Sequence, residues 1–107
     1  MTSRDFRRIA LGLPHATEAA HMGHPDFRVG GKVFATLGYP RPGWAMVKLT
    51  PDQQELFVRT EHGAFAPVTG AWGRAGNTTV RLAAATTGAV REAVLLAWRN
   101  RAPARLG

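Results

Sequence analysis

Histidine and carboxylate side chains are the groups of this chain that could bind a metal ion or transfer a proton. His21 and His24 stand three residues apart, with Asp26 after them and His15 before them. A three-residue spacing suits zinc on a helix. We expect an extended segment instead, because Pro25 disfavours a helical conformation at His24, and residues 21 and 24 of one strand face opposite ways. The sequence therefore predicts no metal site, and the imidazoles are expected to form hydrogen bonds at turns and strand ends.

Residue sets typical of catalysis are missing from the sequence. No serine follows Ser3, and the chain has no cysteine, so the usual nucleophile motifs cannot be formed. Gly30-Gly31-Lys32 joins two predicted strands, whereas a phosphate-binding loop opens a helix. The carboxylates are scattered and are explained by helix caps and helix surfaces. We therefore expect no enzymatic activity, no catalytic residues and no cofactor.

The charge balance favours a polyanionic partner. The net charge is +7, from 14 basic and 7 acidic residues, and such an excess attracts phosphates. There is an alternative, because most of the basic residues are Arg and the chain is rich in Ala and Gly. A GC-rich genome would favour that composition without any selection for binding.

Length and composition limit the class of protein. A chain of 107 residues suits one domain, 1–107, and can bury a core without disulfides or metals. The absence of cysteine fits a reducing compartment. The start of the chain has no apolar stretch typical of a signal peptide, and the longest apolar run is far shorter than the ~20 residues that span a bilayer. We expect a cytoplasmic protein without membrane contact, and favour a monomer.

Residues 23–38 are the most strongly patterned segment and predict a β-hairpin. Apolar and polar residues alternate on both sides of Gly30-Gly31, a pair that supplies the positive φ angles of a tight turn. A loop of these glycines alone would put Val29 opposite Lys32 and mix both faces. A three-residue loop that includes Lys32 pairs Val29 with Val33 and makes one face apolar. We favour the three-residue loop, because a one-residue slip turns every side chain over.

Helices are predicted at both ends of the chain and after residue 50. Capping residues precede all three: Thr2 or Ser3, Thr50, and Thr86 or Thr87. The terminal helices have apolar stripes at Phe6, Ile9, Ala10 and Leu13, and at Val90, Val94, Ala97 and Trp98. Residues 38–43 and 70–77 are rich in glycine and predict loops. The order of elements predicts an α+β fold, an antiparallel sheet of about five to six strands with the N- and C-terminal helices packed on one face.

The sheet face that these helices leave open carries cations and aromatic rings. The alternation places seven residues there: Arg28, Phe34, Thr36, Trp44, Met46, Lys48 and Arg81. Lys32 and Arg41 lie in the adjoining loops. Nucleic-acid platforms combine cations, which meet phosphates, with rings that stack on bases. In the alternative arrangement, Phe34, Trp44 and Met46 lie under another segment, such as residues 70–77.

Several motifs resemble the MmcQ/YjbR family, and the resemblance covers nearly the whole chain. The matching segments are Gly23-His24-Pro25-Asp26-Phe27-Arg28-Val29-Gly30-Gly31-Lys32-Val33-Phe34-Ala35, Lys48-Leu49-Thr50, Ala71-Trp72-Gly73-Arg74 with Gly76, and Ala97-Trp98 to Ala102-Pro103. The resemblance implies a fold similar to frataxin and CyaY. It also implies a predicted DNA-binding role with a double-wing arrangement, and brings no catalytic residues. The candidate wings are the two loops 38–43 and 70–77, or the hairpin turn at 30–32. Met22 departs from the family, where a Trp often precedes Gly-His-Pro.

Two hypotheses for the function follow. The first is a sequence-tolerant DNA-binding domain. Its expected contacts with phosphates, bases and sugars are Arg28, Lys32, Arg41, Trp44, Lys48, Trp72, Arg74 and Arg81. The second is a protein-interaction or small-ligand module that uses the Trp44 and Phe34 face, or the Trp72 loop, as an apolar anchor. An aromatic-lined pocket with scattered cations would favour the second, and a single basic face with projecting loops the first.

Overall fold

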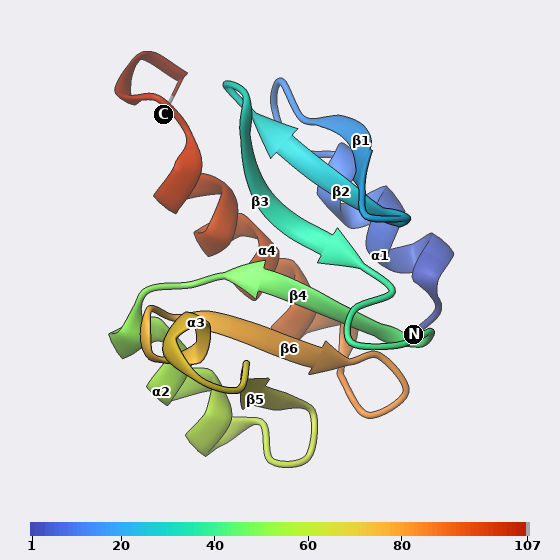
Figure 1. Cartoon of the computed structure of the whole chain (residues 1–107), viewed down its shortest axis with the longest axis vertical. Helices are drawn as coiled ribbons and strands as arrows, with labels where there is room; N and C mark the ends of the chain where they lie inside the picture. Colours follow the sequence, from blue (N-terminus) through green and yellow to red (C-terminus); the bar gives the residue numbers. More distant parts are fainter. Residues whose placement is uncertain (107) are drawn as a thin grey trace.

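Six antiparallel strands form one sheet in a computed structural model that describes residues 1–106. The strands are β1 (Thr17–His21), β2 (His24–Val29), β3 (Lys32–Leu37), β4 (Trp44–Lys48), β5 (Phe65–Pro67) and β6 (Asn77–Arg81), in the spatial order β1-β2-β3-β4-β6-β5. The helices are α1 (Ser3–Leu11), α2 (Pro51–Thr60), α3 (Ala71–Arg74) and α4 (Thr87–Arg101), followed by a short 3-10 turn, Ala104–Leu106. Figure 1 shows α1 and α4 behind the sheet, on the same face. The predicted fold class is confirmed.

The helices begin where their caps predict. Thr2 and Thr50 each accept a backbone hydrogen bond in a complete capping box, and Thr86 accepts one from the N–H of Ala89. Pro51 occupies the first turn of α2, where its missing N–H costs no hydrogen bond. These local signals set the starts of α1, α2 and α4, and with them the orientation of the apolar stripes.

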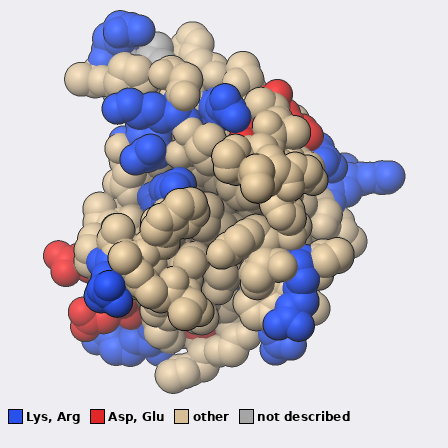
Figure 2. All heavy atoms as spheres, in the orientation of Figure 1, with Lys and Arg blue, Asp and Glu red and all other residues tan. Residues whose placement is uncertain are grey.

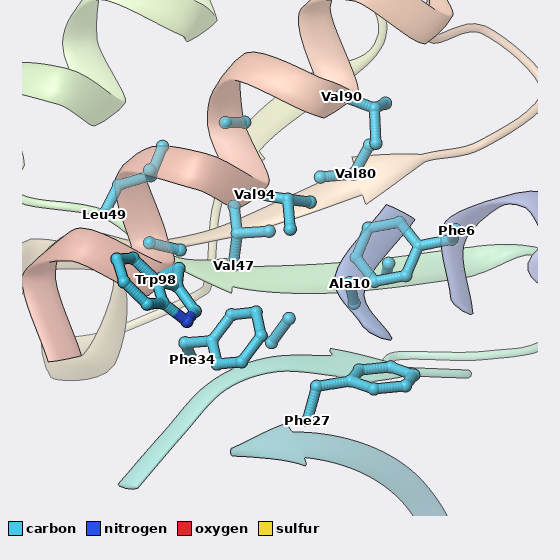
Figure 3. Packing of buried hydrophobic residues seen from close by; sticks show 14 of the residues in the cluster. Phe6, Ala10, Phe27, Phe34, Val47, Leu49, Val80, Val90, Val94 and Trp98 are labelled. Carbon is cyan, nitrogen blue, oxygen red and sulfur yellow. The ribbon is translucent and has the colours of Figure 1, made fainter. Parts of the chain in front are cut away.

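The core lies between the sheet and the two terminal helices. Phe6 and Ala10 of α1 and the Val94 and Trp98 side chains of α4 are buried against Phe27 and its neighbours (Figure 3). Trp98 also donates its indole N–H to the carbonyl of Pro14 over 2.9 Å, so α4 is tied to the segment that follows α1. Both predicted stripes therefore do pack on one face of the sheet, which leaves the other face open.

The β2–β3 hairpin corrects the predicted register. Val29 pairs with Lys32, so the loop holds only Gly30 and Gly31, and Val29 does not face Val33. The two pairs next to the turn are therefore mixed, and a β-bulge restores apolar pairing beyond them. Arg28 pairs with Val33 and Phe27 with Ala35, which leaves Phe34 as the extra residue on β3.

The bulge also overturns the prediction that Phe34 lies on the open face. One extra residue changes which side chains of β3 face the helices, so Phe34 turns inward next to Ala35. Phe34 is completely buried, and Figure 3 shows its ring beside Trp98 of α4. The simple alternation of the sequence could not show this, because it assumes an uninterrupted strand.

The sequence predicts a loop at residues 70–77. The structure has the short helix α3 within this segment. This segment lies very close to neighbouring backbone: a Cβ at Gly73 would overlap the carbonyl of Val68, and one at Gly76 that of Leu49. Gln54 of α2 fastens it, because its buried amide donates to the carbonyl of Gly73 over 3.0 Å. The glycines therefore serve close packing, and α3 is held in a fixed position beside β6. Within residues 1–106 no helix is long and apolar enough to cross a membrane.

Candidate functional site

The open face of the sheet is built by the side chains of β4 that point away from the core. Ala45 and Val47 are fully buried beneath the helices, so Trp44, Met46 and Lys48 project on the opposite side. Arg81 of β6 is the direct partner of Trp44, and Thr36 of β3 is the partner of Met46; both therefore share this face. Strand pairing thus assembles a cation from β6, a ring and a thioether from β4, and a hydroxyl from β3 on one face.

A hollow of about 310 Å³ lies on this face, and its wall is largely apolar and aromatic. Seven residues line it: His21, Met22, His24, Thr36, Tyr39, Met46 and Trp72. The last of these comes from α3, and Met46 in the floor is only 5% exposed. Met46 therefore lies beside the 70–77 segment and is almost fully covered, as the alternative arrangement predicts for this residue.

The β1–β2 turn forms one wall of the hollow and corrects the prediction for the histidines. His21 and His24 belong to different strands and are direct cross-strand partners, so they share a face. The two-residue turn between them has positive φ at both positions, 52° at Met22 and 81° at Gly23. A Met in this conformation is strained, and its side chain is 84% exposed at the edge of the hollow.

Two cation–aromatic pairs flank the hollow. The Arg41 guanidinium lies 5.7 Å from the ring centroid of Trp44, and the Lys48 ammonium lies 5.2 Å from that of Trp72. Such pairs hold a charge next to a ring that is available for stacking. Burial lowers the pKa of Lys48 below its usual range, and the charge of Arg101 lowers it further. An anion bound at Lys48 would therefore meet a partly desolvated cation.

Arg28 lies on the open side but already has a partner. Its guanidinium donates two hydrogen bonds, of 2.8 and 3.1 Å, to the carboxylate of Asp26. The hydrogen bond and the negative charge of Asp26 raise the pKa of Arg28. Asp26 is only 1% exposed, so the pair covers a buried carboxylate next to the hollow. Arg28 therefore brings little free positive charge to this face.

The remaining predicted contacts lie in different places. Lys32 pairs with the buried Val29, which puts it on the side of the helices, at the β2–β3 turn. Arg74 is exposed on α3. Arg81 donates to the carbonyl of Gly63 over 3.3 Å and keeps an exposed guanidinium. The structure thus groups Arg41, Trp44, Lys48, Trp72 and Arg81 on the open side and separates Lys32 from them.

The space-filling view shows the charge pattern of this side. In Figure 2 the basic side chains surround a broad uncharged centre, and the acidic side chains lie at the margins. The face is therefore uncharged at its centre and carries most of its visible charge, largely positive, around the centre. No three His, Asp or Glu side chains gather at metal-ligand distance among residues 1–106.

Sequence reasoning missed most of the residues that line the hollow. Tyr39 belongs to a predicted loop, and its ring meets that of His24 edge-on, with the centroids 6.2 Å apart. The sequence predicts one extended segment through His21 and His24, with the two side chains on opposite faces. One signal could have found them: a two-residue Met22-Gly23 turn would have paired His21 with His24.

Comparisons with known proteins agree with this architecture. The crystal structure of Deinococcus radiodurans protein DR2400, which has the domain DUF419, superimposes with a TM-score of 0.75 at 20% identity, over 91% of this chain and 75% of that one. This likeness shows a shared fold. No curated protein matches. The model of the YjbR family matches residues 11–100, and the chain therefore belongs to the YjbR family.

Proposed function

We propose that this protein binds DNA non-catalytically through the open face of its sheet, mainly by contacts with phosphates. The observation that carries the proposal is the pair of cation–aromatic contacts, Arg41 with Trp44 and Lys48 with Trp72, on one side of the molecule. Cations beside stacking surfaces are what sequence-tolerant nucleic-acid platforms combine. Arg81 adds a third cation, which is exposed and pairs across the strands with Trp44.

The net charge of the chain and the pairing of Asp26 with Arg28 also support phosphate binding at this face. The net charge is +7, and the buried acid nearest the hollow, Asp26, is neutralised by Arg28. A phosphate approaching this face would thus meet cations without a free carboxylate in its path. The segments 38–43 and 70–77, which carry Arg41 and Trp72, flank the face as the family's proposed wings would.

The test is the salt dependence of binding to labelled DNA. Fluorescence anisotropy of a 20-nucleotide single strand and its duplex should saturate at low salt. Affinity should then fall by about 0.9 log units per log unit of salt for each duplex phosphate neutralised, and by about 0.7 for a single strand. The double variant R41E/K48E should reduce this slope by about 2. Absence of a saturable signal with either DNA would refute the proposal.

Lys32 supplies a matched control for charge. It is an exposed cation on the helix side of the sheet, so K32E changes the net charge as K48E does without altering the open face. K32E should keep the slope of the wild-type protein. An equal loss of affinity in K32E and K48E would mean that overall charge, rather than this face, governs binding.

The hollow itself favours a second candidate, a module that binds a small ligand. Its volume of about 310 Å³ is at the lower limit of ligand pockets, and its aromatic wall has a few polar groups. Under this hypothesis a small aromatic ligand would bind with little salt dependence. K48E would then weaken binding much less than removal of the Trp72 ring.

A further inference from the structure

We propose that the hollow holds one unstacked base of a single-stranded nucleic acid, with the adjoining phosphates on Lys48 and Arg41. This inference rests on the proposed function and specifies its substrate, a single strand rather than a duplex. The geometry combines an aromatic-walled recess with cations at its rim (Figure 2). Sequence-tolerant single-strand binding uses both parts, since every base has a face for stacking and every nucleotide a phosphate.

The walls of the hollow suit a flat aromatic ligand. Trp72 of α3 is 59% exposed and stands on one side, and Met22, 84% exposed, belongs to the β1–β2 turn. Tyr39 and His24 add two more rings, held edge to face. A base inserted among these groups would remove exposed apolar surface from water, and its polar edge would reach the wall.

Three residues that line the hollow carry polar side-chain atoms suited to the edge of a base: Thr36, His24 and Tyr39. The side chains of Thr36, His24 and Tyr39 make no hydrogen bond within residues 1–106. In the same residues, every buried side-chain nitrogen or oxygen has a hydrogen-bond partner. Their hydroxyl and imidazole groups must therefore be accessible from outside. They can donate or accept, so they can pair with different bases without strict selection.

The depth of the site separates single strands from duplexes. Met46 in its floor is only 5% exposed, so a ligand must enter the hollow to reach it. A duplex keeps its base faces stacked and presents its backbone, whereas a single strand can turn one base out. The Lys48 ammonium, 5.2 Å from the Trp72 ring, then lies where the phosphate of an inserted nucleotide would pass.

Backbone strain at Met22, in the β1–β2 turn, agrees with a binding role for this residue. A Met at φ 52° is unfavourable, and a Gly or Asn would satisfy the same turn without strain. Strained residues gather at ligand sites, where the side chain is needed for contact. Met22 projects its flexible, polarisable side chain at the edge of the hollow, and such side chains adapt to different partners.

The experiment compares an eight-nucleotide thymidine strand with an abasic strand of the same length and charge. The thymidine strand should bind about 5- to 100-fold more tightly, since stacking of one base contributes that much. W72A should lose this preference, so that the thymidine and abasic strands bind with similar affinity, while W72F should retain most of it. Trp72 is exposed, and circular dichroism would verify that W72A is folded.

A second probe reports directly on the base. A 2-aminopurine placed in the thymidine strand should lose fluorescence when the protein binds, and W72A should abolish that change. Equal affinity for thymidine and abasic strands, with a steep salt dependence, would overturn the base site and leave phosphate binding intact. Tight binding of thymidine monophosphate alone would also overturn it, in favour of a free nucleotide. Failure of every single strand and of the duplex to bind would refute the proposed function as well.

Discussion

At the residue scale, the most informative positions are those whose backbone allows little choice of side chain. Gly76 has a φ of 109°, and a Cβ there would overlap the backbone carbonyl of Leu49. Met22 has a positive φ too, but its Cβ is present, and strain results. One position thus has the residue that its backbone demands, and the other does not. The two make opposite predictions for substitution.

Replacing Gly76 by Ala should destabilise the protein by about 3 kcal/mol or more, because both steric overlap and an unfavourable φ oppose the new side chain. Gly88 in the first turn of α4 is the control, since a Cβ there meets no atom within 4 Å. Gly88→Ala should stabilise the protein by about 0.5 kcal/mol. Urea unfolding measures both, and similar values for the two variants would contradict the assigned packing.

Replacing Met22 by Asn should raise the free energy of unfolding by about 0.5–1 kcal/mol, since Asn tolerates the left-handed conformation. The same variant should weaken binding of the thymidine strand, because the side chain at the edge of the hollow becomes short. Thermal unfolding and anisotropy provide the two readouts. A variant that is less stable than the wild type would show that Met22 is not strained.

At the element scale, one buried amide joins α2, α3 and β6. The side-chain nitrogen of Gln54 lies 3.0 Å from the carbonyls of Gly73 and Asn77 and 3.1 Å from the hydroxyl of Thr78. Since α3 carries Trp72, the buried amide of Gln54 in α2 helps to position one wall of the hollow. A site on an open sheet face thus depends on a side chain in the interior.

Replacing Gln54 by Leu should cost about 1–3 kcal/mol of stability, because the acceptors lose their donor and remain buried. Glu55→Leu is the matched control on the exposed side of α2 and should change stability by less than about 0.5 kcal/mol. Urea unfolding by circular dichroism compares the two. A neutral Gln54→Leu would mean that water replaces the amide.

At the scale of the whole molecule, the sequence could predict what depends on local pattern. Caps at Thr2, Thr50 and Thr86, and the stripe of α4 that ends in Trp98, follow from residue type and helical period. The open face and four of its members, Trp44, Met46, Lys48 and Arg81, follow from alternation.

What local pattern could not predict depends on contacts between distant segments. The side of the sheet on which Phe34 lies depends on a bulge, and the hollow depends on α3 and the β1–β2 turn meeting across Met46. The hydrogen bonds of Gln54 join residues about twenty positions apart. No periodicity in one segment contains that information.

The bulge at Phe34 has a consequence for how this chain can change. Loss of that one residue would restore an uninterrupted β3 while removing the ring that fills the space beside Trp98. Insertion of a second residue would reverse the orientation of every side chain between there and the turn. Length variation among relatives should therefore spare this strand and accumulate instead in the connections, such as 38–43, where added residues leave the register untouched.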